Sequence, residues 1–360
     1  MAFALPVWFA VQQELLVEDE TDFSSPSVFD HFDDETLFQT FHLSRPCVTF
    51  ILDSVRPRLN AHTPLPADAM LMVALNYYAH GVSIVSVLQR VGLSQTECPA
   101  VIGAVSEVIA DMADVFISFP TSRESRTNVA SKIQAFCGIP RVLGVLAPAH
   151  FKIRASPYEK DIFRSFVNSQ GYTSVVTQII CDCDGNILSV EKCCVGSTSE
   201  QEIWDASFKR KEMEQESGGS YWIAGGSGYR LTMHVLTAVS QPTNKREVLF
   251  NEAHAKLHDA MRSTLNNLKR RFRCLMQLGF AQEMTLNRKA NIIKACCVLH
   301  NICKKFSVHL PPAVSSTESL LPGKHSVLAE VKPDAIKARQ ELISDCLIVG
   351  SNSTVADGEK

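Results

Sequence analysis

Apolar residues recur every three to four positions across residues 34–115, which is the spacing of helices that bury one face. The segment "PADAMLMVALNYYAHG" has a proline near its start and a glycine at its end, as helices commonly do. The short helical pattern "VSIVSVLQRVG" is followed by Ser94, a good N-cap, and by a second helical pattern. We therefore predict an all-helical, helix-turn-helix-like domain over 34–115.

The hydrophobic period changes from helical to strand-like after residue 141, once the turn and bridging helix predicted for 116–141 have ended. Strands are then expected at 142–149, 172–184, 186–196 and 221–228, with helices at 198–216, 252–275 and 287–306. Three strands, a helix, a strand and then helices is the element order of a ribonuclease-H-like core. The predicted fold class is therefore α/β, with such a core over 142–306 behind the helical domain.

The two ends of the chain have a different composition. Residues 1–33 are acidic and predict a loosely structured arm. Residues 307–360 are rich in Ser and Pro and predict a mostly disordered tail, with a helix at 333–346. No run of 18 uncharged apolar residues occurs, so we expect no transmembrane helix and no membrane partner.

The cysteines do not have the spacing of a metal site. There are twelve, and no Cys-x-x-Cys pair occurs. The "DCDGN" turn predicts a hairpin that pairs Cys181 with position 188 and position 176 with Cys193, so thiols do not face each other. We expect buried, reduced thiols, which suits the nucleus or the cytosol.

Charge is unevenly distributed along a chain whose net charge is only −3. Residues 91–122 contain no Lys or Arg, although a helix-turn-helix that reads DNA needs cations for the phosphates. The helical domain is therefore predicted to be structural or protein-binding. Positive charge gathers instead in "KRRFR" at 269–273.

Five sequence motifs follow one another along the chain: "VVTQIICDCDGNILSV", "YWIAGGSGYRL", "FNEAHAKLHDAM", "LKRRFRCL" and "ACCVLHNIC". Their order and spacing carry the resemblance described next. Over roughly 35–306 the chain resembles the PIF/Harbinger transposases and the nucleases derived from them. That resemblance implies a ribonuclease-H-like fold in which two Asp and one Glu hold two divalent metal ions. Mg²⁺ or Mn²⁺ would be expected there, because both prefer hard oxygen ligands.

The resemblance places the three family carboxylates at Ala147, Gly226 and Arg262 of this sequence. A guanidinium about 5 Å from a divalent ion, at an effective dielectric near 20, would be repelled by about 6–7 kcal/mol. We therefore expect two-metal cleavage to be lost and no metal cofactor to be bound. On this reasoning the chain is not an enzyme but a pseudo-nuclease, a domesticated scaffold that binds protein or DNA.

An alternative keeps the nuclease activity with displaced ligands. Asp182, Asp184 and Glu200 lie nearby in sequence and could hold Mg²⁺ or Mn²⁺ weakly. The turn acids could instead cap the backbone. The alternative requires the three carboxylates to converge within reach of one metal ion.

The long helix at 252–275 has an apolar and a basic side. Two interpretations of Arg262 stay open: it retains a phosphate backbone in the groove, or it pairs with a groove acid such as Asp182 or Glu200. The apolar side comprises Leu257, Met261, Leu265, Leu268, Phe272 and Leu275, and the candidate DNA- or partner-binding side comprises Arg262, Lys269, Arg270, Arg271 and Arg273.

A partner is implied by the resemblance alone. Transposases of this family are paired with a Myb/SANT-like protein that reads DNA and carries the transposase into the nucleus. We therefore expect such a partner and a nuclear location, with some cytoplasmic protein. The helical domain over 34–115 is the candidate docking surface, and nucleic acid could also bind the basic helix 262–273.

Overall fold

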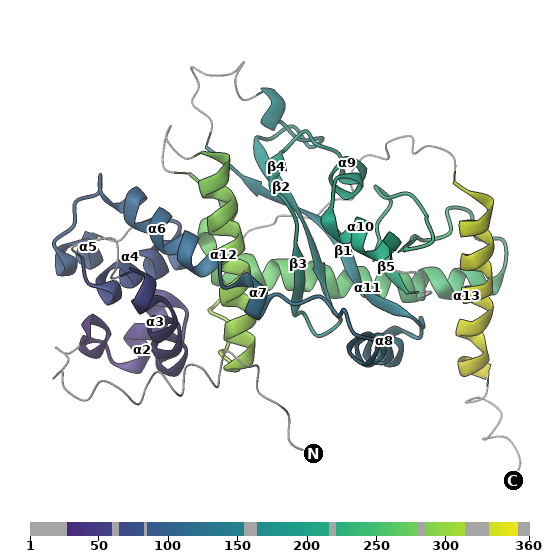
Figure 1. Cartoon of the computed structure of the whole chain (residues 1–360), viewed down its shortest axis with the longest axis horizontal. Helices are drawn as coiled ribbons and strands as arrows, with labels where there is room; N and C mark the ends of the chain where they lie inside the picture. Colours follow the sequence, from purple (N-terminus) through teal and green to yellow (C-terminus); the bar gives the residue numbers. More distant parts are fainter. Residues whose placement is uncertain are drawn as a thin grey trace, which may run out of the picture.

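The computed structural model contains a helical domain, a mixed sheet and long helices that join them (Figure 1). The sequence prediction of an α/β chain is confirmed, and the arrangement is consistent with a ribonuclease-H-like core. The structure describes residues 27–59, 65–82, 85–154, 164–215, 221–279, 285–313 and 331–351, without the side chains of 347–351.

The helical domain is built around one buried helix. Helix α4 (Ala67–His80) is buried along nearly its whole length and ends at Gly81, whose φ of 77° favours glycine. Its neighbour α6 (Cys98–Ala110), which is the second helix of the predicted helix-turn-helix, packs on both α4 and α12. It therefore belongs to the hydrophobic core. The other helices of the domain are η1 (Val28–His31), α2 (Asp34–Phe41), α3 (Arg45–Leu59), α5 (Val85–Val91) and α7 (Ala113–Phe116).

The prediction of a loose arm over 1–33 is wrong at its end. Residues 28–31 form η1, which Ser27 caps, and Phe29 and Phe32 are both buried against Phe41. Three aromatic side chains that pack edge to face anchor this segment on the helical domain. The rest of the predicted arm lies outside the described residues.

The sheet is centred on one long strand. Strand β1 (Val142–Lys152) pairs antiparallel with β2 (Ser174–Cys181) and parallel with β5 (Trp222–Gly225). The strand order is β3-β2-β1-β5-β6, and β4 also pairs with β2. The remaining strands are β3 (Ile187–Val190), β4 (Cys194–Val195) and β6 (Val235–Leu236).

The predicted register of the β2–β3 hairpin holds at Ile179 and Ile180, which pair with Val190 and Ser189, but it is wrong by one residue at the turn and in the pairing with β4. Cys181 pairs with Ile187, because the register shifts between Ile180 and Cys181, and Val176 pairs with Cys194. Such an irregularity inserts a residue that the pattern of hydrophobic positions does not reveal. All twelve cysteines are described; eight of them are buried as predicted, and Cys137, Cys183, Cys194 and Cys346 are partly exposed.

Helices cover both sides of the sheet and connect it to the helical domain. In Figure 1, α11 (Lys245–Arg271) runs along the sheet, α12 (Leu286–Lys305) stands between sheet and helical domain, and α13 (Pro333–Ser351) lies at the far end. The predicted tail helix is thus present and packs on α11. The other elements are α8 (Arg123–Cys137), η2 (Arg164–Phe166), α9 (Glu200–Asp205), α10 (Phe208–Gln215) and η3 (Arg273–Met276).

The predicted apolar side of the long helix is confirmed. All six residues are buried, but α11 ends at Arg271, so Phe272 is its C-cap and Leu275 belongs to η3 rather than to the predicted helix over 252–275. This burial fixes the rotation of α11 and therefore decides which of its polar residues face the ends of β1 and β5. None of the helices in the described ranges is long and apolar enough to span a membrane.

Candidate functional site

A cavity of about 520 Å³ opens between β1, the turn after β5, and α11. Ala147, Gly226 and Arg262 all line it, so the fold brings together the three positions that the resemblance assigns to family carboxylates. Gly226 directly follows β5, and a side-chain carbon there would lie 3.8 Å from the His258 ring. We call this cavity the α11 pocket.

Cations come to the α11 pocket from two elements. Lys152 lies at the end of β1, and Arg262 and Lys269 lie two turns apart on α11. The Nζ atom of Lys269 donates a hydrogen bond of 3.0 Å to the carbonyl oxygen of His150, which holds its ammonium group at the pocket wall. The wall can therefore stabilise a phosphate by charge.

Arg262 has a partner that sequence reasoning did not consider. Its guanidinium forms an ion pair with Asp259, one turn earlier on the same helix, and 51% of its side chain is exposed. The interpretation that Arg262 pairs with Asp182 or Glu200 is therefore wrong. An exposed pair of this kind contributes little to stability and is screened by salt, so Arg262 can change partners at small cost.

Glu200 is the carboxylate that the structure brings into the α11 pocket. It begins helix α9, which Ser199 caps, and its main-chain carbonyl accepts a hydrogen bond of 2.5 Å from Gln178 Nε2. Its carboxyl group rests on Gly228, where a side-chain carbon would lie 2.2 Å from Glu200 Oε2. Burial raises the pKa of Glu200 to about 7, so this carboxyl exchanges its proton near neutral pH.

Three histidines from β1 and α11 complete the wall. Burial lowers the pKa of His150 to about 4 and that of His258 to about 3, so both are neutral near pH 7. The Nε2 atom of His258 is buried with no hydrogen-bond partner among the described residues. His254 is placed by the carbonyl oxygen of Leu236, 3.2 Å from its Nε2 atom.

The pocket does not fit the pair of divalent ions that the resemblance implies. Two such ions need several carboxylates, and Glu200 is the one carboxylate among the described residues of the wall. Nowhere in the described ranges do three His, Cys, Asp or Glu side chains gather as a metal site. Lys269 and Arg262 add repulsion, because a divalent ion there would face two cations.

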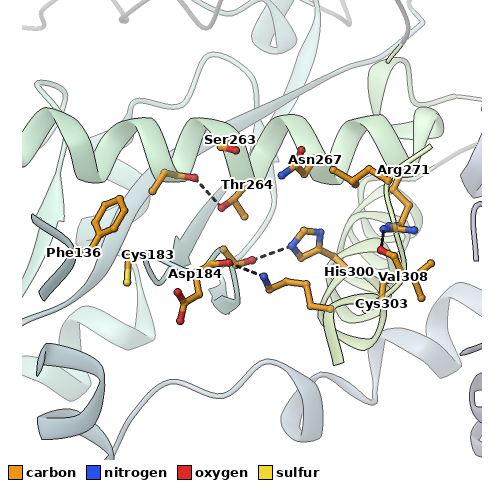
Figure 2. A pocket seen from close by; sticks show the side chains of 14 residues that line it. Phe136, Cys183, Asp184, Ser263, Thr264, Asn267, Arg271, His300, Cys303 and Val308 are labelled. Carbon is orange, nitrogen blue, oxygen red and sulfur yellow. Dashed lines mark hydrogen bonds between the residues drawn. The ribbon is translucent and has the colours of Figure 1, made fainter. Parts of the chain in front are cut away.

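The displaced ligands of the alternative prediction do not converge. Asp182 accepts hydrogen bonds from the main-chain nitrogens of Asp184 and Asn186, at 3.0 and 2.8 Å, and so caps the hairpin turn. Asp184 lines a separate cavity of about 390 Å³, which we call the hairpin pocket (Figure 2). Figure 2 shows His300 of α12 beside the turn, and Lys304 Nζ donates a hydrogen bond of 2.6 Å to the carbonyl oxygen of Asp184. Glu200 lines the α11 pocket instead. The prediction of one metal site from Asp182, Asp184 and Glu200 is wrong.

The predicted basic side of α11 is not one surface. Arg271 is buried at 3% exposure and donates to the carbonyl oxygens of His42, Val308 and His309. Its contact with Val308 is drawn in Figure 2. Arg270 and Arg273 donate to carbonyl oxygens of residues 311 and 312. These three arginines hold the segment that follows α12, and of the predicted five only Arg262 and Lys269 face the α11 pocket.

Sequence reasoning missed Lys152 and the environment of Glu200. A signal for the second was present in "GGSGY", because Gly228 permits the close approach of the Glu200 carboxyl. That contact joins residues 28 positions apart, so periodicity could not reveal it.

Comparison with known proteins shows a domain match and similarity over most of the chain. Residues 149–301 match the DDE superfamily endonuclease model. A Xenopus laevis protein named "Putative nuclease HARBI1" is 28% identical over 319 residues, which is 87% of this chain and 91% of that protein. The Homo sapiens protein of the same name is 26% identical over 320 residues, with the same coverage. An Arabidopsis thaliana protein named "Protein ALP1-like" is 24% identical over 293 residues, or 75% of this chain and 71% of that protein. No solved structure matches the chain.

These comparisons correct the prediction about enzymatic activity. The prediction that the chain is a pseudo-nuclease and not an enzyme is wrong, because residues 149–301 match an endonuclease model and the Xenopus laevis and Homo sapiens relatives carry the name "Putative nuclease HARBI1". The comparisons point to a nuclease and contain no sign of inactivity. The chain carries a DDE superfamily endonuclease domain and is related over most of its length to the Harbinger-derived nucleases.

Proposed function

We propose that the protein is a nuclease that hydrolyses nucleic-acid phosphodiesters in the α11 pocket. One observation carries the proposal: a shielded carboxyl group, Glu200, shares a pocket with Lys152, Arg262 and Lys269. The cations neutralise the phosphate, and a carboxyl group with a pKa of about 7 suits proton transfer at neutral pH. The endonuclease domain match supports the same reaction class.

The proposed reaction uses Glu200 as a general acid. A water oxygen forms a bond to phosphorus, the bond from phosphorus to the leaving oxygen breaks, and the protonated Glu200 carboxyl gives its proton to that oxygen. The attacking water loses a proton to solvent, and Glu200 then takes one from solvent. The products are an alcohol and a phosphate monoester. No step passes through a metal ion, because the pocket residues do not fit one.

The pH dependence of cleavage tests this role. Cleavage of duplex DNA by the purified chain should fall as the pH rises above about 7, because the acid form of Glu200 is then depleted. Glu200→Gln should abolish cleavage. The matched control is Glu252→Gln, since Glu252 is an exposed carboxyl on α11 away from the pocket. Equal loss of activity in both variants, or none in Glu200→Gln, would contradict the assignment.

The Myb/SANT-like partner and the nuclear location rest on the family resemblance and stay predictions. Deleting 34–115 would not test docking, because α6 packs on α12 and its removal would expose the core. The exposed apolar side chains Val82 and Val85 offer a milder test. Aspartate at both positions should weaken binding of a Myb/SANT-like protein without lowering Tm; unchanged binding would place the docking surface elsewhere.

A further inference from the structure

We propose that the α11 pocket binds a nucleic-acid phosphate in direct contact with Lys269 and Arg262, with no divalent metal ion between protein and phosphate. This inference rests on the proposed function, since it concerns the same pocket. It concerns how the pocket binds the phosphate, which can be measured whether or not the phosphodiester bond is cleaved. Three features of the pocket carry it.

The first feature is the sign of the charge. The histidines of the wall are neutral near pH 7, because burial lowers the pKa of His150 to about 4 and that of His258 to about 3. Lys269 and Arg262 are cations, and the pairing of Arg262 with Asp259 lies on the exposed side of α11. The wall therefore attracts an anion and repels a divalent cation.

The second feature is space at the positions where the resemblance expects carboxylates. Ala147 presents only a methyl group and Gly226 only hydrogen, and both line the same cavity of about 520 Å³ as the two cations. A phosphate in this space would contact the ammonium and guanidinium groups directly. In a two-metal site the ions themselves would occupy that space between carboxylates and phosphate.

The third feature is the position of Glu200 in the same wall. As a carboxylate it repels a phosphate in a shielded pocket, whereas as a neutral acid it can donate a hydrogen bond to one. Phosphate binding should therefore strengthen as the pH falls through about 7, the pKa of Glu200. The titratable and charged groups of the surrounding elements are His150 and Lys152 of β1, Tyr172 before β2, Tyr229 after β5, and His254, His258, Asp259, Arg262 and Lys269 of α11.

Tyr229 and the histidines do not compete with Glu200 in this pH range. Burial raises the pKa of Tyr229 well above its ordinary value, and the nearby Glu200 carboxylate raises it further. Burial lowers the pKa of His254 as well as the pKa values of the other two histidines. Glu200 is thus the group of the described wall expected to titrate between about pH 6 and 8.

The test measures binding of a labelled DNA oligonucleotide by fluorescence anisotropy, with EDTA present or with added Mg²⁺ or Mn²⁺. We expect full affinity in EDTA and about a tenfold loss between pH 6 and pH 8, if only protonated Glu200 permits binding. Glu200→Gln should bind equally well at both pH values. Lys269→Ala with Arg262→Ala should lose roughly tenfold or more, whereas Lys245→Ala, an exposed lysine on the same helix, should lose little.

Two results would overturn the inference: binding that appears only when Mg²⁺ or Mn²⁺ is added, or binding that survives Lys269→Ala with Arg262→Ala. The proposed function fails differently. If the chain binds the oligonucleotide without metal and with the expected pH dependence but does not cleave DNA, the proposed hydrolysis is contradicted and the proposed binding mode is supported. If both binding and cleavage require Mn²⁺, the proposed binding mode is contradicted, whereas the proposal that the protein is a nuclease is supported.

Discussion

Two groups of cations on α11 and just beyond it contrast sharply, although their sequence pattern suggested one surface. Arg262 and Lys269 line an open pocket beside Glu200. Arg270, Arg271 and Arg273 donate to carbonyl oxygens of the segment at 308–312, and Arg271 also reaches the helical domain at His42. The first group lines a cavity that a ligand can enter, while the donors of the second group bind main-chain carbonyls and hold two segments of the chain together. A cation's role is therefore decided by which acceptors the fold places beside it.

The largest effect is expected from a substitution of Arg271, one of the three arginines that bind main-chain carbonyls. Arg271→Ala should lower the free energy of unfolding by roughly 3–5 kcal/mol, because it removes a buried guanidinium that donates to three carbonyl oxygens, and the carbonyl of His42 is buried. Urea unfolding of the purified chain measures this. Lys245→Ala removes an exposed cation from the same helix and should change stability by less than about 0.5 kcal/mol. Equal stability of the two variants would contradict the conclusion that Arg271 has a structural role.

The second effect concerns stability against pH. Burial raises the pKa of Glu200 from 4.5 to about 7. The contribution of Glu200 to the free energy of unfolding is therefore most favourable below about pH 4.5, and it is lost as the pH rises through 7. Above that range, Glu200→Gln should therefore be more stable than the parent chain, by up to about 3 kcal/mol. Tm measured from pH 4 to 8 checks this. A difference that is constant with pH would show that Glu200 is not shielded.

The third effect uses the glycine under Glu200. Gly228→Ala places a carbon 2.2 Å from the present position of Glu200 Oε2, so the carboxyl must leave its present position. We expect the pKa of Glu200 to fall toward its ordinary value, with a stability loss of about 1 kcal/mol because a flexible side chain can give way. Titration of the glutamate carboxyl carbons by NMR would detect the fall. Gly92→Ala cannot serve as the control, since φ at Gly92 is 67°; Gly103→Ala on α6 can, because the nearest atom lies 3.8 Å from the new carbon.

The smallest effect concerns the ligand-binding group itself. Asp259→Asn removes the ion-pair partner of Arg262 and should change stability by less than about 0.5 kcal/mol, because the pair is exposed. Oligonucleotide affinity should rise a few-fold, since the Arg262 charge is no longer balanced. A fall in affinity would mean that Asp259 positions Arg262 for the ligand.

Much of the fold could be predicted from the period of apolar residues. The buried side of α11, the helical domain and the tail helix follow from local patterning, because each element must bury its apolar face. The register at Cys181 could not, since it depends on a strand irregularity. Nor could the bonds of Arg271 to Val308 and His42, which join segments 37 and 229 residues away.

The candidate site was predictable in place but not in chemistry. The resemblance correctly brought Ala147, Gly226 and Arg262 to one pocket. It led to a prediction of inactivity because the reasoning counted only the carboxylates expected at those positions. Glu200 and Asp184 are 16 residues apart yet line different pockets, so sequence proximity was a poor guide to the carboxylates that share a site.

The central claim is that the α11 pocket acts on phosphodiesters through Glu200 and its cations. The most direct measurement is the rate of cleavage of a labelled DNA duplex at about pH 6 with all divalent metal removed by EDTA. We expect cleavage by the parent chain and by Glu252→Gln, and none by Glu200→Gln. Cleavage by the parent chain that appears only after Mn²⁺ or Mg²⁺ is restored, or that persists in Glu200→Gln, would contradict it.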